Sequence, residues 1–251
     1  MQSLFDLRGQ VVAVAGAAGA FGSVVARELV RQGCKVAIFD KNDDGLQQLA
    51  SEFSSDSVFS EVFDVRHEAA CQSALQSTSE RWERLDGLIN CVGLFEIIPA
   101  TDMPEKVFSR IVETNLNAAF LMCRHAARIM IPQGCGRIIN IASVSDSISN
   151  PGYAAYAASK AALTHLTRVL AVEWAGYTIT VNAISPAMCD TQLTHSFLDQ
   201  GDNRKNAESR IPLGRLFEPD DILGTVVLLL SRSGAFITGQ AIHIDGGRTL
   251  S

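Results

Sequence analysis

The sequence predicts an α/β protein built on a single doubly wound parallel sheet with helices on both faces. Short apolar runs alternate with longer segments of helical periodicity along the chain, which is the order that a parallel sheet with crossover helices requires. The apolar runs are continuous rather than alternating, as expected for strands that are covered on both faces. A length of 251 residues fits one domain of this class, so we expect residues 1–251 to form a single domain.

The first half of the chain predicts four strands and three helices in alternation. The run at 11–15 is apolar and is followed by a glycine-rich segment. The next segment carries Val24, Val25, Leu29 and Val30 at helical spacing, and Gly33 ends it. By the same criteria we expect strands at 11–15, 35–39, 58–63 and 87–92, and helices at 21–32, 44–53 and 67–84.

The second half predicts two long helices, one shorter helix and three further strands. We expect Pro132 to close the first long helix and Gly176 to end the second. The expected helices span 105–130, 153–175 and 220–230, and the expected strands span 137–142, 178–184 and 241–244. The polar stretch 185–210 is too long for an ordinary connection, and a loop of this length is typically a functional cover.

The composition excludes several classes of protein. Apolar residues make up 47% and charged residues 19%, which excludes intrinsic disorder. The net charge is −6 without a basic block, so neither nucleic acid nor an anionic membrane is an expected partner. No uncharged stretch is long enough for a membrane span, and residues 1–10 lack the pattern of a secretory signal. Six cysteines without a C-x-x-C pair and five histidines without ligand spacing predict a cytoplasmic protein with no metal site.

A glycine-rich turn follows the first expected strand. Segment 16–22 reads Gly-Ala-Ala-Gly-Ala-Phe-Gly and opens a helix, so backbone N–H groups and the positive helix end face one point, as a pyrophosphate requires. Glycine is needed where the backbone turns with positive φ or approaches a phosphate closely. Taken alone, the same pattern also occurs in strand–helix turns that only pack against a sheet.

Two acidic residues at strand ends favour the binding of a dinucleotide. Asp40 ends the second strand, 24 residues after Gly16, where an acid binds the adenosine ribose hydroxyls of a dinucleotide. Its charge would repel a 2′-phosphate, whereas Lys41 would attract one. Because segment 16–22 contains no basic residue, we expect NAD rather than NADP. Asp64 ends the third strand and is expected to reach the adenine.

The strongest chemical signal is the pair Tyr156 and Lys160. Residues four positions apart share one face of a helix, so the phenol and the ammonium are expected to be neighbours. A free tyrosine has a pKa of about 10, and a nearby ammonium favours the phenolate and lowers that pKa. The pair is therefore suited to general acid–base catalysis of alcohol–ketone interconversion, although surface Tyr–Lys pairs without any such role are also common.

With these residues in place, the chain resembles the short-chain dehydrogenase/reductase family over essentially its whole length. The family's Tyr-x-x-x-Lys matches Tyr156 and Lys160, its serine thirteen residues before the tyrosine matches Ser143, and its helix asparagine matches Asn115. Further landmarks match at 90–93, 182–186, 212–215 and 237–247. The resemblance implies an extended Rossmann fold with the active site at the carboxyl ends of the strands.

The resemblance also implies a role for each of these side chains. Tyr156 exchanges a proton with the substrate hydroxyl, and Ser143 hydrogen-bonds the substrate oxygen. Lys160 also binds the nicotinamide ribose, and Asn115 holds a water that links Lys160 to solvent. Tyr153 lies one helical turn before Tyr156 without a lysine four residues on, so we expect it to line the substrate pocket.

The expected site residues fall into three groups, and none is a metal ligand. The catalytic residues are Asn115, Ser143, Tyr156 and Lys160. The cofactor-binding residues are Gly16, Gly19, Ala20, Phe21, Gly22, Asp40, Asp64, Val65, Asn90, Gly93, Tyr156, Lys160, Pro186 and Thr191. The substrate residues are Ser143, Ser145, Tyr153 and Tyr156, with His195, Asp146, Ser147, Asn150 and Met188 as further candidates.

The chain departs from the family pattern in the glycine-rich turn and at a few other positions. Ala15 replaces a threonine, and Ala20 replaces the middle glycine, with Gly19 one place earlier. We expect the methyl group of Ala20 to weaken cofactor binding. Ala187 replaces the glycine that usually follows Pro186. None of these changes removes a catalytic group.

These observations predict an NAD-dependent oxidoreductase that interconverts a secondary alcohol and a ketone by hydride transfer. The polarity of the candidate substrate residues favours a small polyol, a sugar or a sugar acid. The alternatives are a 3-oxoacyl carrier-protein reductase, a dehydratase or epimerase, and a non-catalytic dinucleotide-binding protein on the same fold. The resemblance further implies a homo-oligomer, with a tetramer expected over a dimer, assembled through the helices at 105–130 and 153–175.

Overall fold

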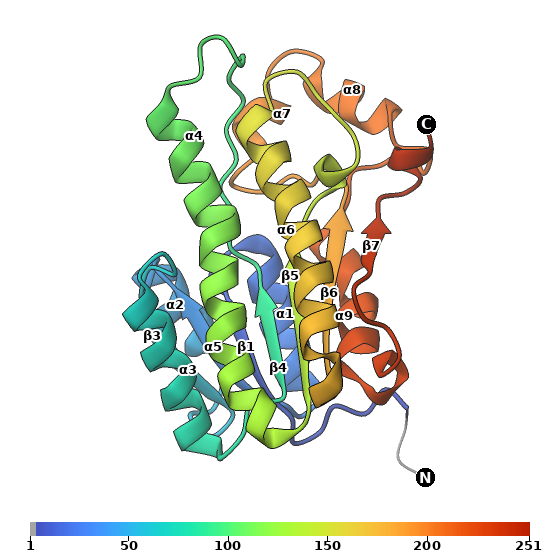
Figure 1. Ribbon diagram of the computed structural model, residues 1–251. Coiled ribbons are helices and arrows are strands. Elements are labelled where there is room, and N and C mark those ends of the chain that lie inside the picture. The colour runs from blue at the N-terminus through green and yellow to red at the C-terminus, as the bar shows by residue number, and fades with distance from the viewer. Residues whose placement is uncertain (1–3) are drawn as a thin grey trace.

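The computed structural model describes residues 4–251, whose strands form one parallel sheet of seven strands (Figure 1). Their order in the sheet is β3-β2-β1-β4-β5-β6-β7. The order reverses between β1 and β4, and ligands of such sheets bind at the carboxyl ends of the strands beside this point. The strands are β1 Val11–Ala15, β2 Lys35–Asp40, β3 Val58–Val62, β4 Gly87–Asn90, β5 Gly136–Ile141, β6 Ile179–Pro186 and β7 Ala241–Ile244.

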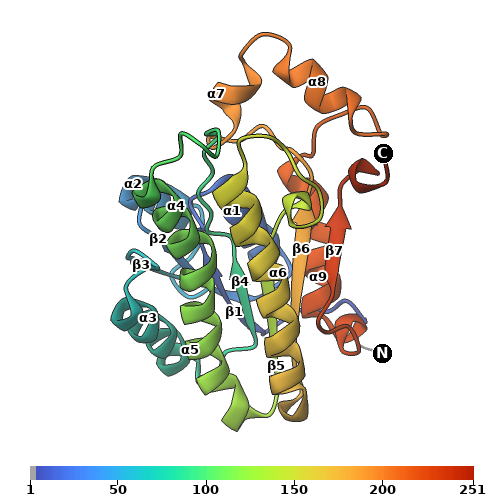
Figure 2. The same cartoon turned by 45° about the horizontal axis from the view of Figure 1, so that its top comes forward.

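Helices cover both faces of the sheet because its buried strands present apolar side chains to both sides. Val12 and Val14 pack into the core on one face, and Val11 and Ala13 pack into the core on the other. The first face is covered by α1 Ala20–Arg31, α2 Asp43–Ala50 and α9 Leu223–Leu230. The second is covered by α3 Glu68–Trp82, α5 Ala118–Gln133 and α6 Ala154–Trp174, which lie in front of the sheet in Figures 1 and 2. The doubly wound architecture expected from the sequence is thus confirmed.

The first long helix differs from its expected form in two ways. It consists of α4 Glu105–Val112, a π-helical turn at Glu113–Asn117 and then α5. It also continues through Pro132, which lies in the last turn of α5, so the expectation that Pro132 closes the helix is wrong. The helix instead ends at Gly134, which has a φ of 71° and donates its N–H to the carbonyl of Met130. Glycine adopts this left-handed conformation without strain, and it ends many helices.

The polar stretch 185–210 is more ordered than its sequence indicates. It contains the end of β6 and two short helices, α7 His195–Leu198 and α8 Asn203–Ser209, which project above the carboxyl ends of the strands in Figure 2. Single turns of 3₁₀ helix occur at Val144–Asp146, Ala175–Tyr177, Pro219–Ile222, Arg232–Gly234 and Arg248–Leu250. Within residues 4–251, no helix is both long and apolar enough to cross a bilayer.

Candidate active site

The glycine-rich turn joins β1 to α1 and packs tightly against the end of β4. Gly16 has a φ of 79°, and a Cβ atom on it would stand 2.9 Å from backbone atoms of both Cys91 and Val92. A Cβ atom on Gly22 would stand 2.1 Å from the carbonyl oxygen of Gly16. Only glycine fits at these two positions. The close packing leaves the first N–H groups of α1 facing an open cavity, as phosphate binding requires.

That cavity has a volume of about 680 Å³ and runs along the carboxyl ends of β1, β2, β3 and β4. Asp40 lies in its wall, where one carboxylate oxygen accepts the N–H of Ala18 at 3.0 Å and the other accepts the N–H of Asn42 at 2.9 Å. These bonds fix the carboxylate at the end of β2. A glycine-rich turn at a helix N-terminus, without charged side chains, and a fixed carboxylate fit a nicotinamide dinucleotide. We call this space the dinucleotide cavity.

Asp64 also lies in the wall of the dinucleotide cavity, but its charge is already paired. The guanidinium group of Arg66 contacts it at 2.5 Å. Hydrogen bonds from Arg66 lower the pKa of Asp64 to about 2, although partial burial opposes the shift. Asp64 is therefore a fixed anion, and the arginine that it holds lies in the same wall.

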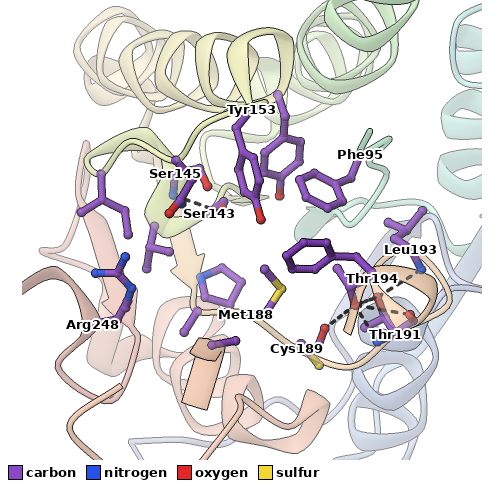
Figure 3. Close-up of a pocket in the computed structure, with 18 of the residues that line it drawn as sticks. Phe95, Ser143, Ser145, Tyr153, Met188, Cys189, Thr191, Leu193, Thr194 and Arg248 are labelled. Atoms are coloured by element: carbon purple, nitrogen blue, oxygen red, sulfur yellow. Dashed lines mark hydrogen bonds between the residues drawn. The ribbon is translucent and has the colours of Figure 1, made fainter. Parts of the chain in front are cut away.

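A second cavity, of about 250 Å³, lies beside the first (Figure 3). Ser143, Ser145, Tyr153 and Tyr156 line it. Three further residues belong to both walls, namely Phe21, Thr191 and Leu193. A ligand in the second cavity therefore lies directly beside a ligand in the dinucleotide cavity. We call the second space the substrate cavity.

Tyr156 is held rigidly in the wall of the substrate cavity by aromatic contacts. Phe95 meets both Tyr153 and Tyr156 edge to face, with ring centroids 4.9 and 4.8 Å apart. Burial raises the pKa of Tyr156 to about 12, and hydrogen bonding with Ser143 opposes the rise. The phenol is therefore protonated at neutral pH in the free protein. Ser143 follows β5, and its hydroxyl oxygen accepts the N–H of Ser145 at 3.2 Å.

The ammonium group of Lys160 lies near the ring of Tyr156 and is hydrogen-bonded to the backbone. Lys160 Nζ lies 5.8 Å from the centroid of the Tyr156 ring and donates a hydrogen bond to the carbonyl oxygen of Ile141 at 2.7 Å. Burial lowers the pKa of Lys160 to about 8. In the free protein the pKa of Tyr156 is therefore raised rather than lowered, because burial outweighs the opposing influences.

Asn115 sits in the π-helical turn between α4 and α5 and is buried. Its amide exchanges two hydrogen bonds with the backbone of Leu94, at 2.7 and 2.9 Å, and donates a third to Ser159 Oγ at 3.0 Å. The side chain thereby ties the loop after β4 to helix α6. It holds the segment that includes Gly93, where a Cβ atom would stand 3.8 Å from Lys160 Nζ.

Comparison with known proteins agrees with this geometry. A family model described as enoyl-(acyl carrier protein) reductase matches residues 16–249. The D-threitol dehydrogenase of Mycolicibacterium smegmatis is 34% identical over 250 residues, which cover 98% of this chain and 95% of that protein. The chain belongs to the short-chain dehydrogenase/reductase family.

Two further members of the family are similar over nearly their whole length. The 3-oxoacyl-[acyl-carrier-protein] reductase of Rickettsia prowazekii is 34% identical over 244 residues, with 97% of this dehydrogenase/reductase and 98% of that protein covered. The crystal structure of a gluconate 5-dehydrogenase from Burkholderia cenocepacia, in complex with NADP and tartrate, has a TM-score of 0.94 and 30% identity. The match covers 98% of each chain.

The structure of this dehydrogenase/reductase places most of the residues singled out from its sequence around the two cavities. The dinucleotide cavity is lined by Gly16, Gly19, Ala20, Phe21, Asp40, Asp64, Val65, Gly93 and Thr191. The substrate cavity is lined by Ser143, Ser145, Tyr153, Tyr156 and Pro186, and also by Asn150 and Met188. Seven others line neither cavity, namely Gly22, Asn90, Asn115, Asp146, Ser147, Lys160 and His195.

Several polar side chains that were expected in the site instead bind other groups of the protein. Asn90 is buried and donates to Asn140 Oδ1 at 2.8 Å. His195 lies outside the cavity wall, where Asp190 and Asp199 hold it at 2.9 and 3.0 Å. The buried carboxylate of Asp146 accepts hydrogen bonds from three hydroxyl groups, those of Ser147, Thr164 and Ser185.

Sequence reasoning missed several residues that line the cavities. The substrate cavity is also lined by Phe95, Ile148, Phe197, Arg210 and Arg248. The dinucleotide cavity is also lined by Arg66, Arg110, Thr114 and Gln192. Arg248 could have been found from its position in the sequence. It comes directly after the Asp-Gly-Gly of segment 245–247, which follows the carboxyl end of the last strand.

Proposed function

We propose that this protein interconverts a secondary alcohol and a ketone with NAD, and that its substrate is a small polyol, a sugar or a sugar acid. The observation that carries the proposal is the position of Ser143 and Tyr156 in the substrate cavity, which shares part of its wall with the dinucleotide cavity. A hydroxyl group that contacts Tyr156 therefore has its carbon atom beside a bound dinucleotide.

In the oxidation, the alcohol loses its O–H proton to the oxygen of Tyr156 and its carbon-bound hydrogen as hydride. A nicotinamide held in the dinucleotide cavity would supply the hydride chemistry in either direction. Ser143 donates a hydrogen bond to the substrate oxygen. In the free protein Tyr156 is protonated, which is the form that donates a proton to a ketone. The phenolate required for oxidation is favoured when positive charge stands near the ring.

Lys160 and Asn115 support this site from behind. The ammonium of Lys160 is held on the carbonyl of Ile141 at the end of β5, close to Gly93 in the wall of the dinucleotide cavity. We propose that Lys160 binds the ribose of the cofactor. Asn115 fixes the backbone of Leu94 by two hydrogen bonds and thereby the position of that wall.

The test of the activity measures NADH formation at 340 nm with a panel of polyols, sugars, sugar acids and 3-hydroxy acids. Tyr156→Phe keeps the aromatic contacts with Phe95 but removes the proton-transfer group, so we expect a loss of kcat of at least about a hundredfold. Ser143→Ala is also expected to lower kcat, because it removes the hydrogen bond to the substrate oxygen. Turnover that survives in Tyr156→Phe, or binding of NADH without turnover of any substrate, would refute the dehydrogenase proposal.

The preference for NAD rests on Asp40, which occupies the end of β2 with both oxygens fixed by backbone N–H groups. A 2′-phosphate placed there would meet this carboxylate. The gluconate 5-dehydrogenase from Burkholderia cenocepacia was solved with NADP, so the ratio of kcat/KM for the two cofactors must be measured. We expect NAD to be preferred and Asp40→Ser to shift the ratio toward NADP by about tenfold or more. A wild-type preference for NADP would refute this assignment.

We also propose that four chains assemble through α5 and α6, which lie side by side on one face of the sheet in Figures 1 and 2. Phe120 on α5 and Val169 and Val172 on α6 are exposed apolar side chains. A second copy of the chain would cover them. Light scattering measures the mass of the assembly.

A further inference from the structure

The substrate cavity is positively charged. Its wall contains two guanidinium groups, those of Arg210 and Arg248, and no Asp or Glu among the described residues. Its remaining polar groups are neutral hydroxyls and amides, such as Ser143, Ser145 and Asn150. In a cavity of about 250 Å³, which is small for a ligand site, any bound ligand lies near these two charges.

These two arginines differ from most others in the chain because no carboxylate neutralises them. Across residues 4–251, no Asp or Glu oxygen lies within ion-pair distance of either guanidinium group. Arg210 makes one long contact, to Asn150 Oδ1 at 3.4 Å. By contrast, nine arginines are paired with acids, namely Arg8, Arg27, Arg31, Arg66, Arg84, Arg110, Arg124, Arg204 and Arg215.

The backbone that carries both arginines is held in place. Ser251 Oγ donates to the carbonyl oxygens of Arg210 and Arg248, at 3.1 and 3.4 Å. Asp245 is nearby in sequence, but its carboxylate accepts the N–H groups of Gly247 and Thr249 at 3.0 and 2.8 Å. The acid therefore shapes the turn before Arg248 and leaves the guanidinium group free for a ligand.

The position of the charges relative to the reaction site sets the orientation of a substrate. Figure 3 shows Arg248 and Ser145 on one side of the cavity and Phe95 and Leu193 on the other. Leu193 belongs to the wall shared with the dinucleotide cavity, so Arg248 lies across the substrate cavity from that shared wall. Arg210 is close enough to Tyr153 to lower its pKa, although burial, which raises the pKa, is the larger influence.

We propose that Arg210 and Arg248 bind an anionic group of the substrate, namely the carboxylate of a hydroxy acid. This inference rests on the proposed oxidoreductase function and narrows its substrate class from polyols, sugars and sugar acids to sugar acids alone. Guanidinium groups bind carboxylates through paired, charge-assisted hydrogen bonds. The carboxylate is bound on the side away from the cofactor, which leaves the carbinol carbon at Ser143 and Tyr156. A phosphate group carries the same kind of charge, and the experiment separates the two.

The experiment compares matched substrates that differ in one group. Gluconate and glucitol share a six-carbon polyhydroxylated chain but differ at C1, where a carboxylate replaces a hydroxymethyl group, and glucitol 1-phosphate carries a phosphate at that same end. Shorter aldonates are each paired with the polyol of the same length. Both NADH formation and calorimetric binding in the presence of NAD are measured, so that affinity is obtained independently of turnover. We expect an aldonate to bind more tightly, and to turn over with higher kcat/KM, than its matched polyol and the phosphorylated polyol.

Three variants locate the source of any such preference. Arg210→Gln and Arg248→Gln are each expected to weaken aldonate binding and lower kcat/KM by about tenfold to a hundredfold, mainly through KM. The kcat/KM for the matched neutral polyol is expected to fall by a much smaller factor than that for the aldonate, and the affinity for NADH, whose cavity neither arginine lines, is expected to stay the same. Arg232→Gln removes one positive charge from a residue that lines neither cavity and controls for net charge. It is expected to leave all of these constants unchanged.

The outcomes separate this inference from the function on which it rests. If neutral polyols turn over in a Tyr156-dependent manner and are preferred over their aldonates, the anion site is refuted and the dehydrogenase remains. Equal losses for aldonate and polyol in the arginine variants also refute it, and a preference for the phosphorylated polyol refutes the carboxylate. If no alcohol turns over and no aldonate binds, both proposals fail.

Discussion

Gly22→Ala tests whether close backbone packing builds the phosphate-binding turn. Gly22 is the third residue of α1, and in a helix alanine is more favourable than glycine by about 1 kcal/mol. At this position, however, the new Cβ atom would stand 2.1 Å from the Gly16 carbonyl oxygen and 2.7 Å from Ala17 Cα. Both are backbone atoms, so no side chain can rotate away to relieve the contact. Helix α1 must therefore move relative to the turn.

The steric cost exceeds the gain in helix propensity. Overpacking costs about 1–3 kcal/mol, and a contact more than about 1 Å too short against backbone belongs at the upper end of that range. We expect the free energy of unfolding of Gly22→Ala to fall by about 1–2 kcal/mol net. Because the first N–H groups of α1 shift with the helix, we also expect NADH affinity to fall by at least about tenfold.

Urea denaturation followed by circular dichroism measures the first effect, and NADH fluorescence titration measures the second. Gly93→Ala is the matched control, since its Cβ atom would meet its nearest neighbour, Lys160 Nζ, at 3.8 Å. This is an ordinary contact, so we expect stability close to that of the wild type. A Gly22→Ala protein that is as stable as the wild type and binds NADH equally well would show that the turn is not built by this contact.

Three other predictions concern the rest of the fold. Burial raises the pKa of Cys71 to about 11 and the pKa values of four other thiols to about 12, namely those of Cys34, Cys91, Cys123 and Cys189. Burial of the protonated thiols stabilises the fold fully below the pKa of an unfolded cysteine, about 9, and this stabilisation is lost as the pH rises toward 11 to 12. The pKa of Lys160 is lowered instead, so this one group changes stability with pH in the opposite direction. The urea midpoint should therefore fall between pH 8 and pH 10, and a constant midpoint would contradict the assignment. Asp146→Ala leaves the buried hydroxyl groups of Thr164 and Ser185 without their acceptor, so we expect a loss of about 2–3 kcal/mol in thermal or urea denaturation. A loss below about 0.5 kcal/mol would show that water or a neighbouring group replaces it. Val172→Glu places a charge at a position 81% exposed in the single chain and should convert a tetramer to smaller species in light scattering, whereas a monomeric wild type would exclude the assembly.

The order of strands and helices could be predicted because each element carries its own local pattern. The strands are apolar runs and the helices are periodic, so the doubly wound sheet follows from the sequence alone. The interruption of the long helix at Glu113–Asn117 could not be predicted, because the local periodicity does not show that Asn115 hydrogen-bonds the distant backbone of Leu94 from this turn. Pro132 was misread for a related reason, since Gly134 decides where α5 ends.

The candidate site shows the same division between local and distant information. The four-residue spacing of Tyr156 and Lys160 places them on one helix face, but it does not say where the ammonium points, and the carbonyl of Ile141 decides that. His195 has a suggestive position in the sequence, yet Asp190 and Asp199 hold it outside the cavity wall. Arg248 enters the substrate cavity only because the chain after β7 folds back over it.

The wall common to the two cavities couples their ligands. Phe21, Thr191 and Leu193 face both spaces, so any adjustment that these side chains make to one ligand changes the surface offered to the other. The two dissociation constants are then linked, and by thermodynamic necessity the factor by which cofactor changes substrate affinity equals the factor by which substrate changes cofactor affinity. The shared wall thus links the two binding free energies. Replacing Leu193 by alanine would alter this coupling more than it alters the affinity of either site alone.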